Sequence, residues 1–231
     1  MNTEAIMVRR LGRVPYAPVF RKMTEFTCQR NVSTPDEIWV VEHDPVFTLG
    51  QAASRAHILD AHGIPVYETD RGGEVTYHGP GQLVVYLLID LRRRFRKLYV
   101  RELVYRIEET IIRALSVFHL DGERRKGAPG IYIPAHPMYG GLQGAKIAAL
   151  GLKVRSNGCM YHGFALNVAM DLEPFKWIDP CGYHGLAVTD MRSLGFSGRK
   201  EDVMQTVLAC LSSELACSLK IADGMETEDD R

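Results

Sequence analysis

RGGEVTYHGPGQLVVYLLIDL, residues 71–91, divides into a polar, glycine-rich half and an almost continuous apolar half. The apolar half, residues 83–91, is typical of a strand that is buried on both faces. Glycine allows positive φ angles and lets the backbone approach a ligand closely. Arg71 adds a fixed cation, and His78 adds a side chain that can gain or lose a proton. The stretch therefore predicts a binding loop held next to a buried strand.

The glycine-rich half has a second interpretation, because Gly-Gly and Gly-Pro-Gly are also typical of tight turns. A hairpin built on two such turns would need no charged or titratable side chains. Arg71, Thr76 and His78 are residue types that bind or react with ligands, so the sequence favours a binding site. A purely structural hairpin remains the alternative.

Further strands and helices are expected on both sides of the loop. Residues 38–41, 64–69 and 130–170 contain strand-like apolar runs, and an Asn-Gly pair at 157–158 indicates a hairpin within the last of them. The apolar spacing of three segments predicts amphipathic helices: residues 16–30, 100–118 and 203–219. A short helix is expected over residues 54–62, closed by Gly63.

The composition is that of an ordinary globular protein. Its 231 residues include 28 Lys and Arg and 28 Asp and Glu, a balance that argues against a broad basic surface for nucleic acid. No apolar run reaches the roughly 18–20 residues of a membrane span. We expect one domain over residues 1–222, with its core at about 15–200, and an acidic tail over 223–231 that frays.

Cysteines occur at five irregularly spaced positions: Cys28, Cys159, Cys181, Cys210 and Cys217. An odd number of cysteines, without a preceding apolar signal segment, predicts reduced thiols. We therefore expect a cytoplasmic protein. Cys210 and Cys217 lie on the expected helix over 203–219 and are assigned to the core.

Two basic clusters, RRRFRK at 92–97 and Arg124–Lys126, stand out in the sequence. Positive charge just before the helix at 100–118 opposes the helix dipole, so local stability does not explain the first cluster. The second is expected in a loop. The two could dock an acidic partner or a phosphate, but a solvated charged surface is the favoured interpretation.

The strings Cys159-Met-Tyr-His162 and Cys181-Gly-Tyr-His184 could together supply four ligands to a structural zinc ion. The first string lies at the start of a predicted strand. Residues three apart in a strand point to opposite faces, so these two could chelate one ion only if the backbone bends. A zinc site is therefore the less favoured interpretation.

Cys181 and Lys146 are the candidates for covalent chemistry. Cys181 lies between Pro180 and Gly182, where little side-chain bulk shields its sulfur. An unperturbed cysteine has a pKa of about 8.5, so a nucleophilic thiol needs a cation beside it. Lys146 begins an apolar run and is the best candidate for that cation. The alternative is a strand-end lysine whose ammonium group reaches water.

These segments resemble the lipoyl(octanoyl) transferases over roughly residues 15–200. The resemblance is carried by RGGEVTYHGPGQLVVYLLIDL, by PGIY at 129–132, by KIAALGLKV at 146–154, by HGFALNV at 162–168 and by PCG at 180–182. The first string is long and specific, and the order and approximate spacing of the others also match.

The resemblance implies an α/β fold of the biotin/lipoyl ligase type, in which helices flank a mixed β-sheet. The implied activity is transfer of an octanoyl group from octanoyl-acyl carrier protein to a lysine of lipoyl domains, in 2-oxoacid dehydrogenase complexes and in the glycine cleavage H protein. It implies no cofactor and no metal. We expect a monomer that binds neither nucleic acid nor membrane.

The resemblance also implies the roles of individual residues. Cys181 would carry the acyl thioester, and Lys146 would lower the cysteine pKa and act as a base. Substrate-binding segments would be residues 71–78, 149–151 and 162–164: Arg71, Gly72, Gly73, Glu74, Val75, Thr76, Tyr77, His78, Ala149, Leu150, Gly151, His162, Gly163 and Phe164. Leu150, Phe164 and Tyr77 are expected to line the acyl slot. Oxyanion donors are expected among the backbone N–H groups near Gly72, Gly73 or Lys146.

Two rival functions are open from the sequence. The first is an ATP-dependent lipoate or biotin ligase, which would activate a free acid as its adenylate. A Walker-type phosphate loop is absent from the sequence, but ligases of this fold do not use one. The second is a protein that binds an acyl group or docks a carrier protein without turnover. Transfer of an acyl group to an acceptor would exclude the second rival.

Overall fold

The computed structural model describes residues 4–95, 99–182 and 184–222, and for Cys181 the backbone alone. The acidic segment that was expected to fray, residues 223–231, lies outside the described residues. So does the end of the first basic cluster, since residues 96–98 are also not described. None of the helices in the described ranges is long and apolar enough to cross a membrane.

A large mixed sheet forms the centre of the molecule, with strand order β11-β1-β2-β6-β10-β9-β8-β7. β1 pairs in parallel with β2 and β11, and the other neighbours are antiparallel. The strands are β1 (Ile6–Val14), β2 (Glu37–His43), β6 (Gln82–Asp90), β7 (Glu123–Arg125), β8 (Ala128–Tyr132), β9 (Lys146–Val154), β10 (Cys159–Asn167) and β11 (Leu219–Ala222). The prediction of a mixed α/β sheet is confirmed.

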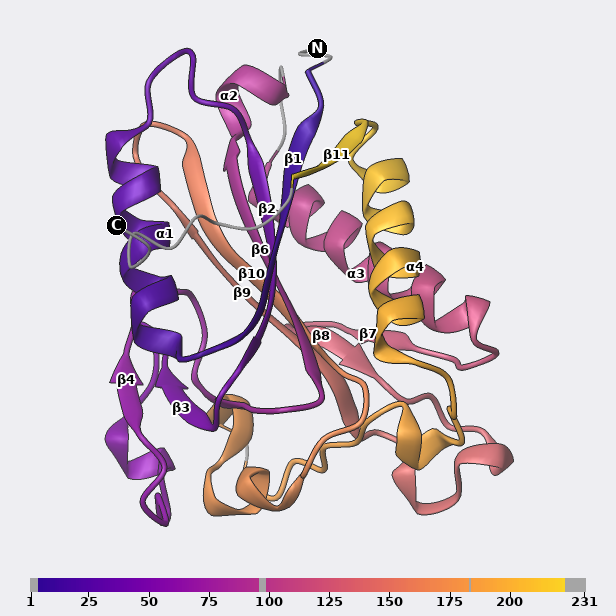
Figure 1. The fold of residues 1–231 in the computed structure, drawn as a ribbon. Coiled ribbons are helices and arrows are strands. Elements are labelled where there is room, and N and C mark those ends of the chain that lie inside the picture. Colours follow the sequence, from indigo (N-terminus) through magenta and orange to yellow (C-terminus); the bar gives the residue numbers. More distant parts are fainter. Residues whose placement is uncertain (1–3, 96–98, 183, 223–231) are drawn as a thin grey trace.

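Helices cover both faces of this sheet (Figure 1). α1 (Tyr16–Gln29) packs on one face, where Val19 and Met23 contact the outward residues of the central strands. α3 (Val100–Val117) and α4 (Lys200–Glu214) cover the other face. The helices predicted at 16–30 and 100–118 are confirmed. The helix predicted over 203–219 is wrong at its end, because Cys217 follows the helix and is only half-buried.

A smaller sheet, β4-β3-β5, lies beside the large one and presents the glycine-rich segment. Its strands are β3 (Val46–Leu49), β4 (Val66–Glu68) and β5 (Val75–His78). The prediction of an irregular loop from residue 71 to residue 82 is therefore wrong in its second half. Residues 75–78 form a strand because they pair with all four residues of β3.

A short helix over residues 54–62 does not form. Only the 3₁₀ turn η1 (Arg55–His57) is present, capped by the Ser54 side chain. Directly after it Ile58 is extended, and Leu59 N–H donates to the Trp177 carbonyl at 2.8 Å while Asp179 N–H donates to the His57 carbonyl at 2.8 Å. Tertiary pairing with residues 177–179 thus replaces the local helical hydrogen bonds. The other 3₁₀ turns are η2 (Pro137–Leu142), η3 (Glu173–Trp177), η4 (Pro180–Gly182) and η5 (Arg192–Leu194).

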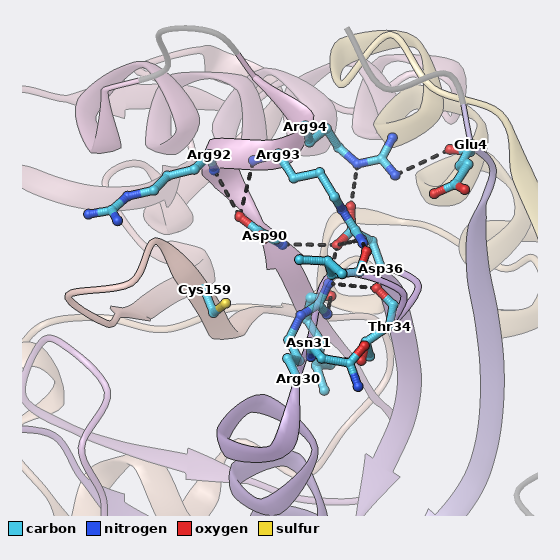
Figure 2. Close-up of polar contacts among 12 residues, drawn as sticks. Glu4, Arg30, Asn31, Thr34, Asp36, Asp90, Arg92, Arg93, Arg94 and Cys159 are labelled. Carbon is cyan, nitrogen blue, oxygen red and sulfur yellow. Dashed lines mark hydrogen bonds and ion pairs between the residues drawn. The ribbon is translucent and has the colours of Figure 1, made fainter.

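Arg93 and Arg94 of the first basic cluster belong to a structural network, which corrects the expectation of a solvated surface for these two residues (Figure 2). Asp36 is buried and its carboxylate accepts hydrogen bonds from Arg30 at 2.5 Å, Arg93 at 3.1 Å and Arg94 at 2.6 Å. The two latter residues belong to α2 (Leu91–Arg94), whose N-terminus is capped by the Asp90 side chain. Local stability therefore does explain why these arginines follow β6.

The second basic cluster is also mostly paired. Arg124 lies on β7, not in a loop, and its side chain contacts Glu108 at 3.3 Å and Glu109 at 2.6 Å. The Arg125 guanidinium lies over the Tyr132 ring at 4.5 Å. These pairs use much of the charge that was considered for docking an acidic partner.

Candidate active site

A cavity of about 470 Å³ lies where the glycine-rich segment meets β9 and β10. This volume is within the range of small-molecule sites. Most of the predicted site residues line it: Arg71, Gly72, Gly73, Glu74, Thr76, His78, Lys146, Ala149, Leu150, Gly151, His162, Gly163 and Phe164. The fold therefore brings together segments that are separated by up to about ninety positions in the sequence.

The side chains of Val75 and Tyr77 do not line the cavity, and their assignment as substrate-binding residues stays a prediction. They alternate along β5 with Thr76 and His78, so their side chains point to the opposite face. There they are buried in a separate core cluster with Phe47 and Phe175. Tyr77 therefore does not form a wall of an acyl slot.

A one-residue bulge in β9 aims Lys146 at the cavity. β8 pairs Ile131 with Ala148 and Tyr132 with Lys146, so Ile147 has no partner in this ladder. Ile147 and Ala148 both pack in the core beneath α3 and α4. In a regular strand the Lys146 side chain would lie on the same face of the sheet as Ala148. The extra residue turns the Lys146 side chain to the opposite face, which lines the cavity.

Lys146 is buried, with 5% of its surface exposed, and this excludes a strand-end lysine that reaches water. Its Nζ donates to the Pro129 carbonyl at 3.2 Å and lies 5.0 Å from the centre of the Tyr132 ring. A side chain at Gly130 would come within 3.2 Å of this Nζ. The PGIY segment thus forms the immediate surroundings of the ammonium group.

Glu108 on α3 holds the PGIY segment in place through a hydrogen bond, a role that the sequence did not reveal. Its Oε1 accepts a hydrogen bond from Gly130 N–H at 3.0 Å, and the carboxylate is buried. The helical apolar pattern gives no signal for it, because Glu108 occupies a polar position of a regular amphipathic helix.

The backbone of Cys181 lies in η4, where Gly182 N–H donates to the Asp179 carbonyl at 2.9 Å. Its side chain lies outside the described residues, so its distance from Lys146 stays a prediction. The chain that follows η4 runs beside the start of β9. Lys146 N–H donates to the Ala187 carbonyl at 2.8 Å, and Thr189 N–H donates to the Lys146 carbonyl at 3.0 Å.

Arg71 holds the glycine-rich loop in place. Its guanidinium donates to the carbonyls of Thr48 at 2.6 Å, Gly72 at 3.1 Å and Glu74 at 2.8 Å. The loop also docks on β9, because Gly72 N–H donates to the Leu152 carbonyl at 2.9 Å. The backbone N–H groups of Gly72 and Lys146 both donate to carbonyls, whereas Gly73 and the neighbours of Lys146 stay the predicted oxyanion donors.

Three histidines beside the cavity are held neutral. Burial, and then the neighbouring His43, lower the pKa of His78 to about 3. Burial likewise lowers the pKa of His43 to about 4, and its Nε2 is hydrogen-bonded to the Tyr86 hydroxyl at 2.7 Å. Burial also lowers the pKa of His162. At neutral pH these imidazoles act as uncharged hydrogen-bonding groups.

Asp70 and several aromatic residues of the site were missed by sequence reasoning. The Asp70 carboxylate contacts His162 Nε2 at 2.9 Å and accepts a hydrogen bond from the Tyr161 hydroxyl. Tyr16 and Tyr86 line the cavity from α1 and β6. Asp70 directly precedes the glycine-rich stretch, and this adjacency is its only sequence signal.

The paired Cys-x-x-His strings do not form a cluster within the described residues. Cys159 is buried, whereas His162 is hydrogen-bonded to Asp70. His184 Nδ1 contacts Asp179 at 2.9 Å. Among the described side chains, no group of three or more His, Cys, Asp or Glu residues could hold a metal ion.

Comparisons with known proteins agree on one family. The profile of the lipoyl protein ligase A/B catalytic domain matches residues 19–212. The chain is 55% identical over 212 residues to the octanoyltransferase of Herminiimonas arsenicoxydans, a match covering 91% of this chain and 96% of that protein. It is 56% identical over 214 residues to the octanoyltransferase of Paraburkholderia xenovorans strain LB400, covering 92% and 88% of the two chains.

Solved structures show the same fold at low sequence identity. Lipoate-protein ligase A bound with ATP superposes with a TM-score of 0.74 at 14% identity, over 96% of this chain and 90% of that one. Biotin protein ligase from Aquifex aeolicus gives a TM-score of 0.53 at 13% identity, over 92% and 70% of the two chains. The expected biotin/lipoyl ligase-like architecture is confirmed.

Proposed function

The chain belongs to the family of lipoyl protein ligase A/B catalytic domains, and from this premise we propose that it is an octanoyltransferase. It moves an octanoyl group from octanoyl-acyl carrier protein to a lysine of lipoyl domains. The acceptors are the lipoyl domains of 2-oxoacid dehydrogenase complexes and the glycine cleavage H protein. The observation that carries the proposal is the buried Lys146 ammonium group in the cavity wall, on a chain about 55% identical to octanoyltransferases.

In the first half-reaction, the Cys181 thiolate attacks the carbonyl of the carrier-bound thioester. A C–S bond to Cys181 forms, the C–S bond to the carrier breaks, and the carrier leaves as a thiol after taking a proton from Lys146. The Lys146 cation supports this step because a nearby positive charge favours the thiolate over the thiol. Its burial strengthens that influence, since screening by water is weak there.

In the second half-reaction, the neutral amine of the acceptor lysine attacks the acyl-Cys181 thioester. The amide bond forms, the C–S bond to Cys181 breaks, and the proton of the attacking nitrogen passes to Lys146. Lys146 can take it because it lost its own proton to the departing carrier thiol. Cys181 and Lys146 therefore return to their starting charges.

The cavity wall suits an acyl chain. Ala149 and Gly151 of β9 lie opposite Ala165 and Gly163 of β10, and all four line the cavity. Such small side chains leave room above the sheet. Each buried methylene group of an acyl chain contributes about 0.8 kcal/mol.

Intact mass spectrometry after incubation with octanoyl-acyl carrier protein tests the proposal. We expect the chain to gain the mass of one octanoyl group, and the Cys181→Ala variant to gain none. Cys28→Ala is the matched control, since Cys28 is an exposed thiol away from the cavity, and it should be acylated like the wild type. A wild-type chain without mass gain, or an acylated Cys181→Ala variant, would contradict the mechanism.

An ATP-dependent ligase is the alternative function that is compatible with the fold, because lipoate-protein ligase A has the same architecture. Such an enzyme would release pyrophosphate from ATP in the presence of octanoate, without a carrier protein. We expect no pyrophosphate release. Transfer of octanoate in the presence of ATP alone would favour the ligase.

A further inference from the structure

The charged side chains around the cavity bear on how the acceptor lysine binds in the second half-reaction of the proposed function. Two cationic side chains line the cavity, Arg71 and Lys146, and Glu74 contributes the only carboxylate among the described residues that line it. An acceptor lysine arrives as an ammonium ion, since its unperturbed pKa is about 10.4. Lys146 has lost its proton at that stage, but the Arg71 guanidinium still opposes the entry of another cation, so a counter-charge is needed at the place where the lysine binds.

Glu74 lies beside the turn that carries the acyl group in the proposed mechanism. A Cβ placed on Gly182 would lie 3.2 Å from the Glu74 carboxyl carbon and 3.4 Å from Oε1. Gly182 has a φ of 72°, a left-handed conformation that favours glycine. The carboxylate therefore packs directly on the residue that follows Cys181.

The Glu74 carboxylate is only partly used by the protein itself. Oε2 contacts His57 Nδ1 at 3.2 Å, whereas no hydrogen bond from a described residue reaches Oε1. The side chain is 24% exposed, so it is accessible to a ligand. His57 is anchored to the same turn, because its carbonyl accepts a hydrogen bond from Asp179 N–H at 2.8 Å.

We propose that Glu74 binds the ammonium group of the acceptor lysine and holds that lysine next to the acyl thioester on Cys181. The inference rests on the proposed function and assigns to Glu74 a role in the second half-reaction only. A carboxylate near a thiol disfavours the thiolate, so Glu74 cannot assist the first half-reaction by its charge. Glu74 exchanges no proton: the lysine is bound charged, releases one proton to water, and attacks as the neutral amine, which passes one further proton to Lys146 as the amide bond forms.

The test compares the two half-reactions in Glu74→Gln, which keeps the side-chain size and removes the charge. Octanoyl-enzyme is formed from octanoyl-acyl carrier protein and then mixed with a lipoyl domain or with hydroxylamine, a nucleophile that is uncharged at neutral pH. We expect the KM for the lipoyl domain to rise roughly tenfold, as for the loss of one charged hydrogen bond. Acyl-enzyme formation should be no slower, and the reaction with hydroxylamine should be unchanged.

Glu68→Gln is the matched control, because Glu68 lies on β4 and is 68% exposed in an ion pair with Arg55. It removes the same charge from a side chain that does not line the cavity, and it should leave the KM for the lipoyl domain unchanged. Glu74→Asp should restore part of the affinity. Added salt should raise the wild-type KM and affect Glu74→Gln less.

Two outcomes would overturn the inference. If Glu74→Gln slows acyl-enzyme formation and hydroxylamine cleavage as much as lipoyl-domain transfer, Glu74 only supports the turn around Cys181. If the KM for the lipoyl domain stays at the wild-type value, the carboxylate does not bind the acceptor. Failure of the proposed function is distinguishable from both, because the wild-type chain would then form no acyl-enzyme.

Discussion

Gly151 positions the glycine-rich loop by having no side chain. A Cβ at this position would lie 2.7 Å from the Gly72 carbonyl oxygen and 3.2 Å from Cδ of Arg71. The loop can therefore approach the edge of β9 closely enough for Gly72 N–H to reach the Leu152 carbonyl. One glycine in KIAALG and one in RGG thus form a single contact between segments about eighty residues apart.

Replacing Gly151 by alanine should push the loop away from β9. We expect a loss of about 1–3 kcal/mol in the free energy of unfolding, as for overpacked sites, and a slower formation of the octanoyl-enzyme. Urea denaturation and intact mass spectrometry measure the two effects. Gly141→Ala is the control, because no atom lies within 4 Å of a Cβ at that position; equal behaviour of the two variants would contradict the expectation.

At the scale of elements, α2 is a helix that its own length cannot stabilise. Its four residues are far fewer than the roughly 12–15 that an isolated helix needs. The Asp90 side chain caps it by accepting hydrogen bonds from Arg92 N–H and Arg93 N–H, each at 3.1 Å. Asp36, directly before β2, then binds two of its arginines (Figure 2). One buried carboxylate therefore joins α1, β2 and α2.

Asp36→Asn should destabilise the fold strongly, because it leaves three arginine side chains around a neutral group. Breaking a buried ion pair by changing one partner costs about 3–5 kcal/mol. Urea denaturation gives this free energy. Asp60→Asn, at a side chain that is 66% exposed, should change it by less than about 0.5 kcal/mol. A loss at Asp36 no larger than at Asp60 would show that the network is not structural.

At the scale of the molecule, the buried histidines make stability depend on pH. The pKa values of His43 and His78 fall to about 4 and about 3 in the fold, against about 6.5 in an unfolded chain. Between pH 7 and pH 5 the unfolded chain binds protons at both residues and the folded chain does not. Stability is therefore full above pH 6.5 and is lost as the pH falls towards the folded pKa values.

We expect the free energy of unfolding to decrease from pH 7 to pH 5 by about 2 kcal/mol for each of these two histidines. His43→Gln should make this decrease smaller by the contribution of one histidine. His119→Asn is the control, because His119 is exposed with a φ of 58° that asparagine tolerates. Urea denaturation at a series of pH values decides the matter, and an unchanged slope in His43→Gln would contradict the assignment.

The sequence predicted the large elements of the fold because they follow strong patterns. The apolar spacing of α3 and the buried run of β6 are correctly placed, and the Asn-Gly turn correctly joins β9 and β10. β1 was missed, since its arginines obscure the alternation that a half-buried strand shows. β5 was missed because it is a strand only through its pairing with β3.

The site was predictable as a set of segments, through their resemblance to a family, but not as a geometry. No sequence pattern indicates that Ile147 forms a β-bulge, although this bulge turns the Lys146 side chain towards the cavity. The partners Asp70 and Glu108 act through tertiary contacts with His162 and Gly130. Such contacts depend on which distant segments of the chain become neighbours in the fold, and a local sequence pattern does not contain this information.

The place of β1 between β2 and β11 has a consequence for synthesis on the ribosome. β1 emerges before both of its partners, and β11 emerges about 200 residues after it, or roughly 10–40 s later at about 5–20 residues per second. During that time one edge of β1 is open to pairing with other nascent chains. Arg9, Arg10 and Arg13 lie on this strand, and charged side chains on an open edge discourage such pairing. In the folded chain the same arginines form ion pairs with Glu37, Glu201 and Asp44. Their charges therefore discourage intermolecular pairing before folding and hold β1 to its neighbours after folding.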